Sequence, residues 1–170
     1  MRIFRVFDPL LDLDNNIYQL NYAKELGAYT TGVLAYGHSP VHTDELYAKK
    51  AKELVERAKL DAIMLKDAPG LLTPDRVRTL VPAIKKVIGK IPLELHTHCT
   101  TGLGPMTVLE GVKAGADQVH TSIAPLANGA AQPAMQTIVR NLRAMGYTVN
   151  VDDSLVDEVG EYFQKVSEQE

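Results

Sequence analysis

Short apolar runs alternate with amphipathic stretches along the whole chain, and this alternation limits the possible folds more than any other feature. Between the runs, apolar residues recur at intervals of three and four, as in Val77, Leu80 and Val81, which indicates helices. The apolar runs lie at residues 3–7, 29–36, 61–65, 92–97 and 117–121. The predicted helices span residues 16–26, 43–59, 75–88, 106–114 and 133–145. Strands that alternate with helices pair in parallel beneath a helical layer, so the sequence predicts an α/β fold.

The number of repeated units limits how far such a sheet can close. The predicted strands begin near residues 2, 29, 61, 92 and 117, one about every 29 residues. Eight such units would need roughly 230 residues, close to the ~250 of a closed eight-stranded α/β barrel. With 170 residues, the chain holds about five units. We therefore expect a partial barrel domain over residues 1–150. An amphipathic helix within residues 151–170 would pack on that domain or lead to a following one.

Composition excludes several classes of function. The 18 Lys and Arg residues against 21 Asp and Glu residues give a net charge of −3, which argues against a nucleic-acid-binding surface or a polybasic membrane patch. No apolar run approaches the ~18 residues of a membrane-spanning helix. The single cysteine, Cys99, cannot form an internal disulfide and is expected to be structural. A reducing, cytoplasmic location fits this cysteine usage.

Two histidines end the fourth predicted strand, in the sequence Leu-Glu-Leu-His-Thr-His at residues 93–98. Because alternate residues of a strand share a face, Glu94, His96 and His98 point to the same side. Ligands bind at the carboxyl ends of parallel strands, and two adjacent imidazoles there suit zinc or manganese. The alternative is that one histidine caps a loop and the other fills a polar pocket. We predict a metal site at His96 and His98.

A lysine, Lys66, follows the third predicted strand. Burial at this end of the sheet would lower the pKa of its amine. A neutral amine can attack a carbonyl, or take up carbon dioxide as a carbamate that resembles a carboxylate ligand. The alternative is a surface lysine that extends into solvent beside Asp67.

Further polar groups are expected at the same end of the sheet. Asp8 ends the first strand and Arg5 is a candidate inward-facing cation, while His38 and His42 lie in the loop after the second strand and His120 lies late in the fifth. Solvent exposure or packing is the simpler interpretation for the three histidines.

A loop rich in small residues covers positions 124–133 and precedes the last helix of the alternation. Pro133 suits the first turn of that helix. Such a loop is able to bind an anion with its backbone N–H groups, or it is simply a tight connection.

In this order, these segments resemble the biotin-dependent carboxyltransferase domains, the group that includes pyruvate carboxylase, the oxaloacetate decarboxylase alpha subunit and the transcarboxylase large catalytic subunit. More distantly, they resemble the metal-dependent lyases and Claisen synthases of the same HMG-CoA lyase-like superfamily. The resemblance covers nearly the whole chain. The matching segments are residues 4–8, 39–43, 65–67 with 70–74, 96–98, and 128–129 with 132–133.

The resemblance implies a (β/α)8 TIM barrel, of which this chain holds strands four to eight and lacks the first three. It also implies transfer of a carboxyl group between carboxybiotin and a keto acid of the pyruvate or oxaloacetate type, through a metal-stabilised enolate. The implied site residues are Lys66 and Asp8 in catalysis, Arg5, Asn128 and Gln132 in substrate binding, and carboxylated Lys66, His96 and His98 as ligands of zinc or manganese.

Several parts of the family pattern must come from elsewhere. The resemblance implies a segment that supplies strands one to three, with a further aspartate ligand, and a biotin carrier domain, because no Met-Lys-Met segment is present. We expect an oligomer, and an isolated chain that is inactive.

One residue of the chain departs from the family pattern. Ala130 stands where the family has a threonine that is proposed to transfer a proton, and a methyl group cannot do so. Ala130 favours one alternative, a biotin-independent lyase or Claisen-type synthase of the same superfamily. The absent first three strands favour another, an inactive half-barrel that serves as an assembly partner.

Overall fold

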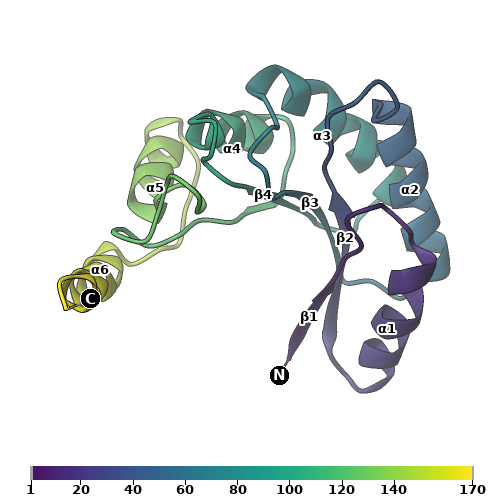
Figure 1. The fold of residues 1–170 in the computed structure, drawn as a ribbon, viewed down its shortest axis with the longest axis horizontal. Coiled ribbons are helices and arrows are strands. Elements are labelled where there is room, and N and C mark those ends of the chain that lie inside the picture. Colours follow the sequence, from purple (N-terminus) through teal and green to yellow (C-terminus); the bar gives the residue numbers. More distant parts are fainter. Residues whose placement is uncertain (1, 170) are drawn as a thin grey trace.

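The computed structural model describes residues 2–169 and contains one parallel sheet in which the strands follow their sequence order (Figure 1). The strands are β1 (Ile3–Val6), β2 (Tyr29–Ala35), β3 (Ala62–Asp67), β4 (Leu93–Thr97) and β5 (Gln118–Val119). The helices are α1 (Asp14–Glu25), α2 (Asp44–Arg57), α3 (Pro74–Ile88), α4 (Gly104–Lys113), α5 (Met135–Ala144) and α6 (Asp153–Ser167). The predicted α/β alternation is confirmed.

The helices α1 to α4 lie on the outer, convex side of the curved sheet, and no helix within residues 2–169 lies on the inner side (Figure 1). Leu34, Leu65 and Leu95 are register partners on β2, β3 and β4. All three are buried in one core cluster with side chains from α1, α2 and α3. Since alternate residues face opposite sides, this apolar row assigns Lys66 and His96, one position further along their strands, to the inner side.

The last strand and the helix after it differ from the sequence prediction. Residues 117–121 were predicted to form a strand, but β5 spans only Gln118–Val119. It pairs with β4 alone, at the edge of the sheet. Pro133 was predicted in the first helical turn, and this is wrong because α5 begins at Met135. Instead, the Pro133 carbonyl accepts a hydrogen bond from the Ser122 N–H at 3.0 Å, which draws this segment alongside the end of β5.

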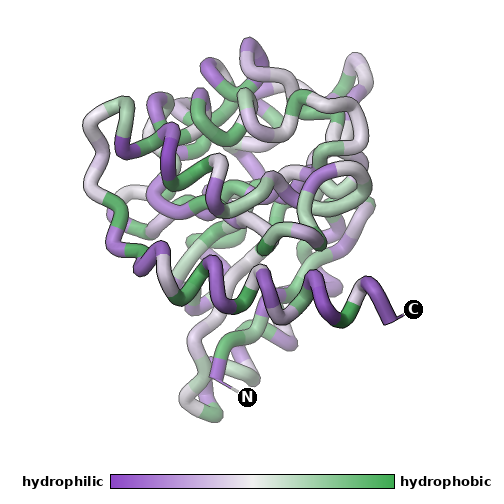
Figure 2. Tube along the Cα trace, turned by 90° about the vertical axis from the view of Figure 1, so that its left-hand side faces the viewer, coloured by the Kyte–Doolittle hydropathy of each residue, from purple (hydrophilic) through white to green (hydrophobic). Residues whose placement is uncertain are grey.

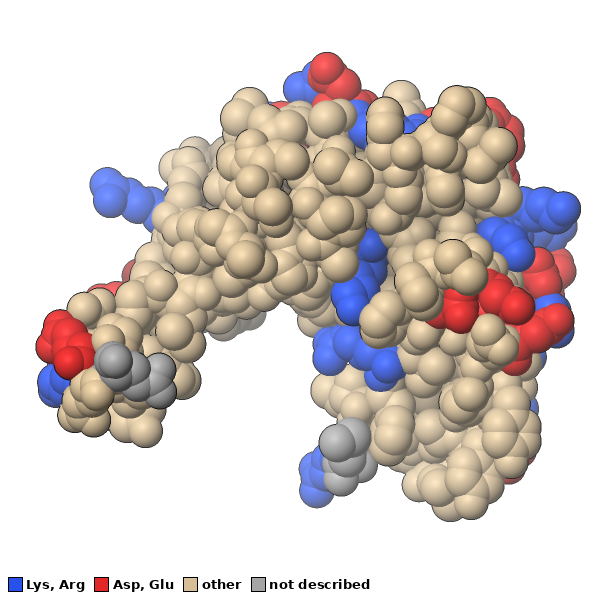
Figure 3. Space-filling model, viewed as in Figure 1, with Lys and Arg blue, Asp and Glu red and all other residues tan. Residues whose placement is uncertain are grey.

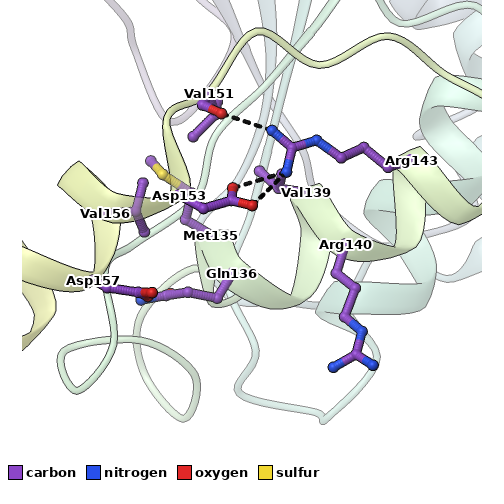
Figure 4. Close-up of a pocket in the computed structure, with 9 residues that line it drawn as sticks. All are labelled: Met135, Gln136, Val139, Arg140, Arg143, Val151, Asp153, Val156 and Asp157. Atoms are coloured by element: carbon purple, nitrogen blue, oxygen red, sulfur yellow. Dashed lines mark hydrogen bonds and ion pairs between the residues drawn. The ribbon is translucent and has the colours of Figure 1, made fainter.

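Helix α6 lies at the far end of the arc from β1 (Figure 1). None of its described residues is buried, and its apolar residues Leu155, Val159 and Tyr162 are exposed. Polar and apolar residues alternate along this helix in Figure 2. Its start is held by Arg143 of α5, which donates hydrogen bonds of 2.8 and 2.7 Å to Asp153 beside a cavity of about 400 Å³ (Figure 4). The division of the chain between residues 150 and 151 stays a prediction. The outer bounds, residues 1 and 170, lie outside the described residues.

The sequence predicts no apolar run long enough for a membrane-spanning helix. Within residues 2–169, no helix combines the length and the apolar character that a membrane crossing requires.

Candidate functional site

The carboxyl ends of β3 and β4 bring Lys66 and His96 together. The strand β3 continues through Asp67, two residues beyond the predicted end at residue 65, and Lys66 is the register partner of His96. His98 follows directly after β4, and His120 follows β5. Lys66 and the three histidines, predicted from separate segments, therefore meet at one end of the sheet.

Three imidazoles form the centre of the site. The Nε2 atoms of His96 and His98 lie 3.1 Å apart, and the Nδ1 atoms of His96 and His120 lie 3.0 Å apart. His120 was predicted only as a possible polar group at this end of the sheet. Its position follows from the register of β4 and β5. Val119, the last residue of β5, pairs with Leu95, so the residue that follows it, His120, lies beside His96.

Gln132 lies beside these histidines, in the loop before α5, and its role in substrate binding stays a prediction. Its Nε2 atom lies 2.9 Å from Nε2 of His98 and 3.3 Å from Nε2 of His96. The Ser122 hydroxyl donates a hydrogen bond of 2.9 Å to Gln132 Oε1, which orients the amide so that its N–H groups face the two histidines.

A buried carboxylate lies behind the histidines. The side chain of Glu94 is 1% exposed and accepts hydrogen bonds from Arg5 Nε and Thr31 Oγ1, each at 3.3 Å. His120 Nε2 lies 3.2 Å from Glu94 Oε2 but off the line of a hydrogen bond, and it has no other partner among residues 2–169. Burial raises the pKa of the Glu94 carboxyl, but contact with His120 and Arg5 outweighs burial, so the net shift is downward.

The electrostatic environment favours uncharged bases at the centre. Burial, followed by the neighbouring His120, His98, Lys66 and Arg5, lowers the pKa of His96 to about 4, so its ring is neutral at pH 7. Burial also lowers the pKa of the Lys66 amine. The Nζ atom of Lys66 lies 3.7 Å from the centre of the Phe7 ring, which partly covers it.

Asp67 has a structural role on the opposite side of β3 from Lys66. It is fully buried and accepts hydrogen bonds from the N–H groups of Leu71 and Leu72 and from Thr97 Oγ1, at 2.9, 2.8 and 2.7 Å. Both carboxylate oxygens are therefore occupied. The Lys66 side chain is half-buried against Phe7 rather than paired with Asp67.

Two of the predicted site residues have local partners instead. The Asp8 carboxylate accepts hydrogen bonds from Leu10 N–H at 2.7 Å and Asn15 Nδ2 at 3.0 Å, within its own loop. Asn128 adopts a positive φ of 68°, and its N–H donates to the Gln132 carbonyl at 2.8 Å, which shapes the loop around Gln132. Neither side chain contacts the three histidines.

The remaining candidates lie outside the cluster. His42 pairs with Ser39 Oγ at 2.7 Å in the loop before α2, and His38 lies in the same loop. Cys99 is buried, and burial raises the pKa of its thiol, which suits the predicted structural role.

The donor atoms can be compared with the needs of a metal ion. Among residues 2–169, no group of three or more His, Cys, Asp and Glu side chains is arranged to hold a metal. The pair of His96 and His98 nevertheless fits two positions around one ion. Nitrogens that each lie ~2.0–2.1 Å from a tetrahedral zinc are roughly 3.3 Å apart, close to the observed 3.1 Å. Lys66, beside His96, would need to become a carbamate to supply a third ligand.

A glycine lets the loop after β3 pass close to the segment that follows β4. Gly70 has a φ of 71°, and a Cβ atom there would lie 2.8 Å from the His98 carbonyl oxygen. We expect Gly70→Ala to destabilise the chain by roughly 1–3 kcal/mol more than Gly102→Ala, since overpacking is added to the cost of the positive φ. Gly102 is the matched control because its φ is 80° and, among residues 2–169, no atom outside its chain neighbours lies within 4 Å of the added Cβ. Urea denaturation measures both variants, and equal losses would contradict the steric argument.

The fold and the site define a class of protein: a parallel α/β domain with a histidine-rich site at the carboxyl ends of its strands. The protein family described as HMGL-like matches residues 14–162. The chain belongs to the HMGL-like family.

The curated relatives that align with nearly the whole chain include carboxylases and carboxyltransferases. The chain is 43% identical over 98% of its length to a pyruvate carboxylase subunit from Methanocaldococcus jannaschii, and covers 29% of that protein. It is 33% identical over 98% of its length to the methylmalonyl-CoA carboxyltransferase 5S subunit of Propionibacterium freudenreichii subsp. shermanii, and covers 33% of it. The chain thus spans about a third or less of these relatives.

A solved structure matches along nearly the whole chain. The carboxyl transferase domain of Rhizobium etli pyruvate carboxylase, determined with pyruvate, superposes with a TM-score of 0.92 at 28% identity, over 98% of this chain and 29% of that one. The resemblance to carboxyltransferase domains is therefore confirmed, and so is the fold class, a five-stranded part of a TIM-barrel-type domain.

Proposed function

We propose that the chain supplies the metal-binding part of a biotin-dependent carboxyltransferase, which moves a carboxyl group between carboxybiotin and a keto acid of the pyruvate or oxaloacetate type. The observation that carries the proposal is the convergence of His96 Nε2 and His98 Nε2, 3.1 Å apart, beside Lys66. The relatives named pyruvate carboxylase and carboxyltransferase support the same reaction class.

In this proposal His96 and His98 hold zinc or manganese, and carboxylated Lys66 is the third ligand. The lowered pKa of Lys66 increases the fraction of neutral amine, which adds to carbon dioxide, forms an N–C bond and releases one proton to solvent. A bound divalent ion supplies charge stabilisation at a substrate oxygen. With their lone pairs engaged by a metal, His96 and His98 would no longer accept from Gln132, and its amide N–H groups would be available to an anionic substrate.

The missing strands would pair with an edge of the sheet, and the substrate would bind on its inner side. Strand β1 is an edge strand whose residues Ile3 and Phe4 are exposed, which suits a segment that supplies the first three barrel strands. Lys and Arg side chains gather along the hollowed side of the molecule in Figure 3. A positive potential there would attract the carboxylates of a keto acid and of carboxybiotin. The biotin carrier domain belongs to another domain or protein in this proposal.

The metal prediction is tested by elemental analysis of the chain purified with the segment that completes the barrel. We expect zinc or manganese at about one ion per chain, lost in the double variant His96→Ala with His98→Ala, because both proposed nitrogen ligands are removed. The matched control is His38→Ala with His42→Ala, which removes two histidines outside the site. Full metal retention in the first variant would reject the proposed centre.

A second enzymatic candidate is a biotin-independent lyase or Claisen-type synthase. It is favoured by Ala130, whose side chain offers no hydroxyl for proton transfer while its carbonyl contacts His98 Nδ1 at 2.6 Å. Turnover of a keto acid without any biotinylated partner would select this candidate. The third candidate, an assembly half-barrel, would be selected if no metal bound even beside the completing segment.

A further inference from the structure

The two Nε2 atoms that face each other at 3.1 Å are able to act as ligands only if neither carries a proton. In a neutral imidazole one ring nitrogen carries the proton and the other has the lone pair. The state of each Nε2 is therefore decided by the contact that the opposite nitrogen, Nδ1, makes. The Nδ1 atoms of His96 and His98 have different partners.

For His98 the contact decides the tautomer directly. Its Nδ1 atom lies 2.6 Å from the carbonyl oxygen of Ala130. A carbonyl oxygen only accepts, so Nδ1 of His98 must carry the proton. The Nε2 atom of a neutral His98 ring then has the lone pair.

For His96 the contact is another imidazole, which is able to donate or accept. Its Nδ1 atom lies 3.0 Å from Nδ1 of His120, so one of these two nitrogens carries a proton. The choice is made at the other side of the His120 ring, where Nε2 lies 3.2 Å from the Glu94 carboxylate. In a neutral His120 ring, a buried negative charge at that distance favours the tautomer with the proton on Nε2. Nδ1 of His120 then accepts from Nδ1 of His96, and Nε2 of His96 has the lone pair.

The other pair of tautomers has the proton on Nδ1 of His120 and on Nε2 of His96. Two contacts are then unfavourable. The lone pair of His120 Nε2 would face the Glu94 carboxylate, and a proton on His96 Nε2 would face the Gln132 amide group at 3.3 Å. The orientation of that amide is set by Ser122, which donates to Gln132 Oε1. With both lone pairs present, the Gln132 N–H groups donate to His96 and His98 instead.

We propose that Glu94, acting through His120, is a positioning residue that holds His96 in the tautomer whose Nε2 lone pair faces that of His98. This inference rests on the proposed function, because the paired lone pairs are useful only to a bound metal. Arg5 and Thr31 keep the carboxylate in place from the neighbouring strands. The sequence motif His-x-His supplies the two ligands, and Glu94 with His120 orients one of them.

Nitrogen NMR of the ¹⁵N-labelled, metal-free 170-residue chain tests the inference without any activity. Protonated and unprotonated imidazole nitrogens have well-separated ¹⁵N shifts, so each tautomer is observed directly. We expect a protonated Nδ1 and an unprotonated Nε2 in both His96 and His98, and a protonated Nε2 in His120. A protonated Nε2 in His96 would overturn the proposal.

Variants then separate positioning from simple structural support. Glu94→Gln keeps the shape but removes the charge, so we expect His96 to populate the other tautomer and the zinc dissociation constant to rise about 10- to 100-fold. Glu110→Gln is the matched control: it makes the same change at a carboxylate on α4 that pairs with Arg78 and Lys113, and both tautomers and zinc affinity should stay unchanged. His120→Ala repeats the test in case Glu94→Gln fails to fold, which circular dichroism shows. Unchanged tautomers and zinc affinity in a folded Glu94→Gln or His120→Ala variant would overturn the proposal.

The two proposals fail in distinguishable ways. If the wild-type chain shows the expected tautomers but binds no zinc even in the completed assembly, the proposed function fails and the positioning role of Glu94 is supported. If zinc binds while His96 Nε2 is protonated in the metal-free chain, the proposed function is supported and the positioning role is overturned.

Discussion

Lys66→Arg in the assembled protein is expected to lower carboxyl transfer by about 10³-fold or more, even though arginine keeps the positive charge. A guanidinium group stays protonated and cannot add to carbon dioxide, so the third metal ligand of the proposed site is lost. Charge stabilisation by a metal contributes several kcal/mol, and about 1.4 kcal/mol corresponds to a tenfold change in rate. The position of Lys66 beside His96, together with its lowered pKa, motivates this expectation.

Two measurements check this prediction. Carboxyl transfer is assayed for Lys66→Arg and for Lys59→Arg, an exposed lysine after α2 that serves as the control. In parallel, ¹³C NMR in ¹³C-bicarbonate should show a carbamate signal in the wild type that is absent from Lys66→Arg and present in the control. Retained activity in Lys66→Arg would mean that this lysine acts only as a cation, which contradicts the proposed ligand.

Asp67→Ala is expected to destabilise the fold by roughly 3–9 kcal/mol, because the variant leaves three buried donors without an acceptor and each costs about 1–3 kcal/mol. These donors are the N–H groups of Leu71 and Leu72 and the hydroxyl of Thr97. Domains of this kind have a total stability of only about 5–15 kcal/mol. The variant should therefore lose much of its cooperative unfolding transition in urea.

Two control variants define the origin of the loss. Asp75→Ala removes an acidic side chain that is 89% exposed on α3, and surface changes of this kind usually stay within about 0.5 kcal/mol. Asp67→Asn keeps the shape and one acceptor oxygen, so its loss should lie between those of the two alanine variants. A loss for Asp67→Ala no larger than for Asp75→Ala would refute the structural role of this carboxylate.

The order of strands and helices was predictable because it depends on local patterns. Apolar spacing located α2 and α3, and Thr43 and Thr73 cap these two helices with side-chain hydrogen bonds. The limits of β5 and α5 were predicted less well. They depend on which segments lie alongside, such as the contact between Ser122 and Pro133, and no local periodicity encodes such a contact.

The sequence by itself determined which chemical groups lie at the ends of the strands. Lys66, His96 and His98 follow from strand alternation, which is a property of the backbone. Only the tertiary structure decided how these groups are oriented. Glu94, His120 and Gln132 act on the His96 and His98 rings from across strands and from a distant loop, and the Asp8 carboxylate is bound within its own loop. The physical reason is that the position of a proton on an imidazole depends on contacts within about 3 Å, and only folding brings such distant residues that close.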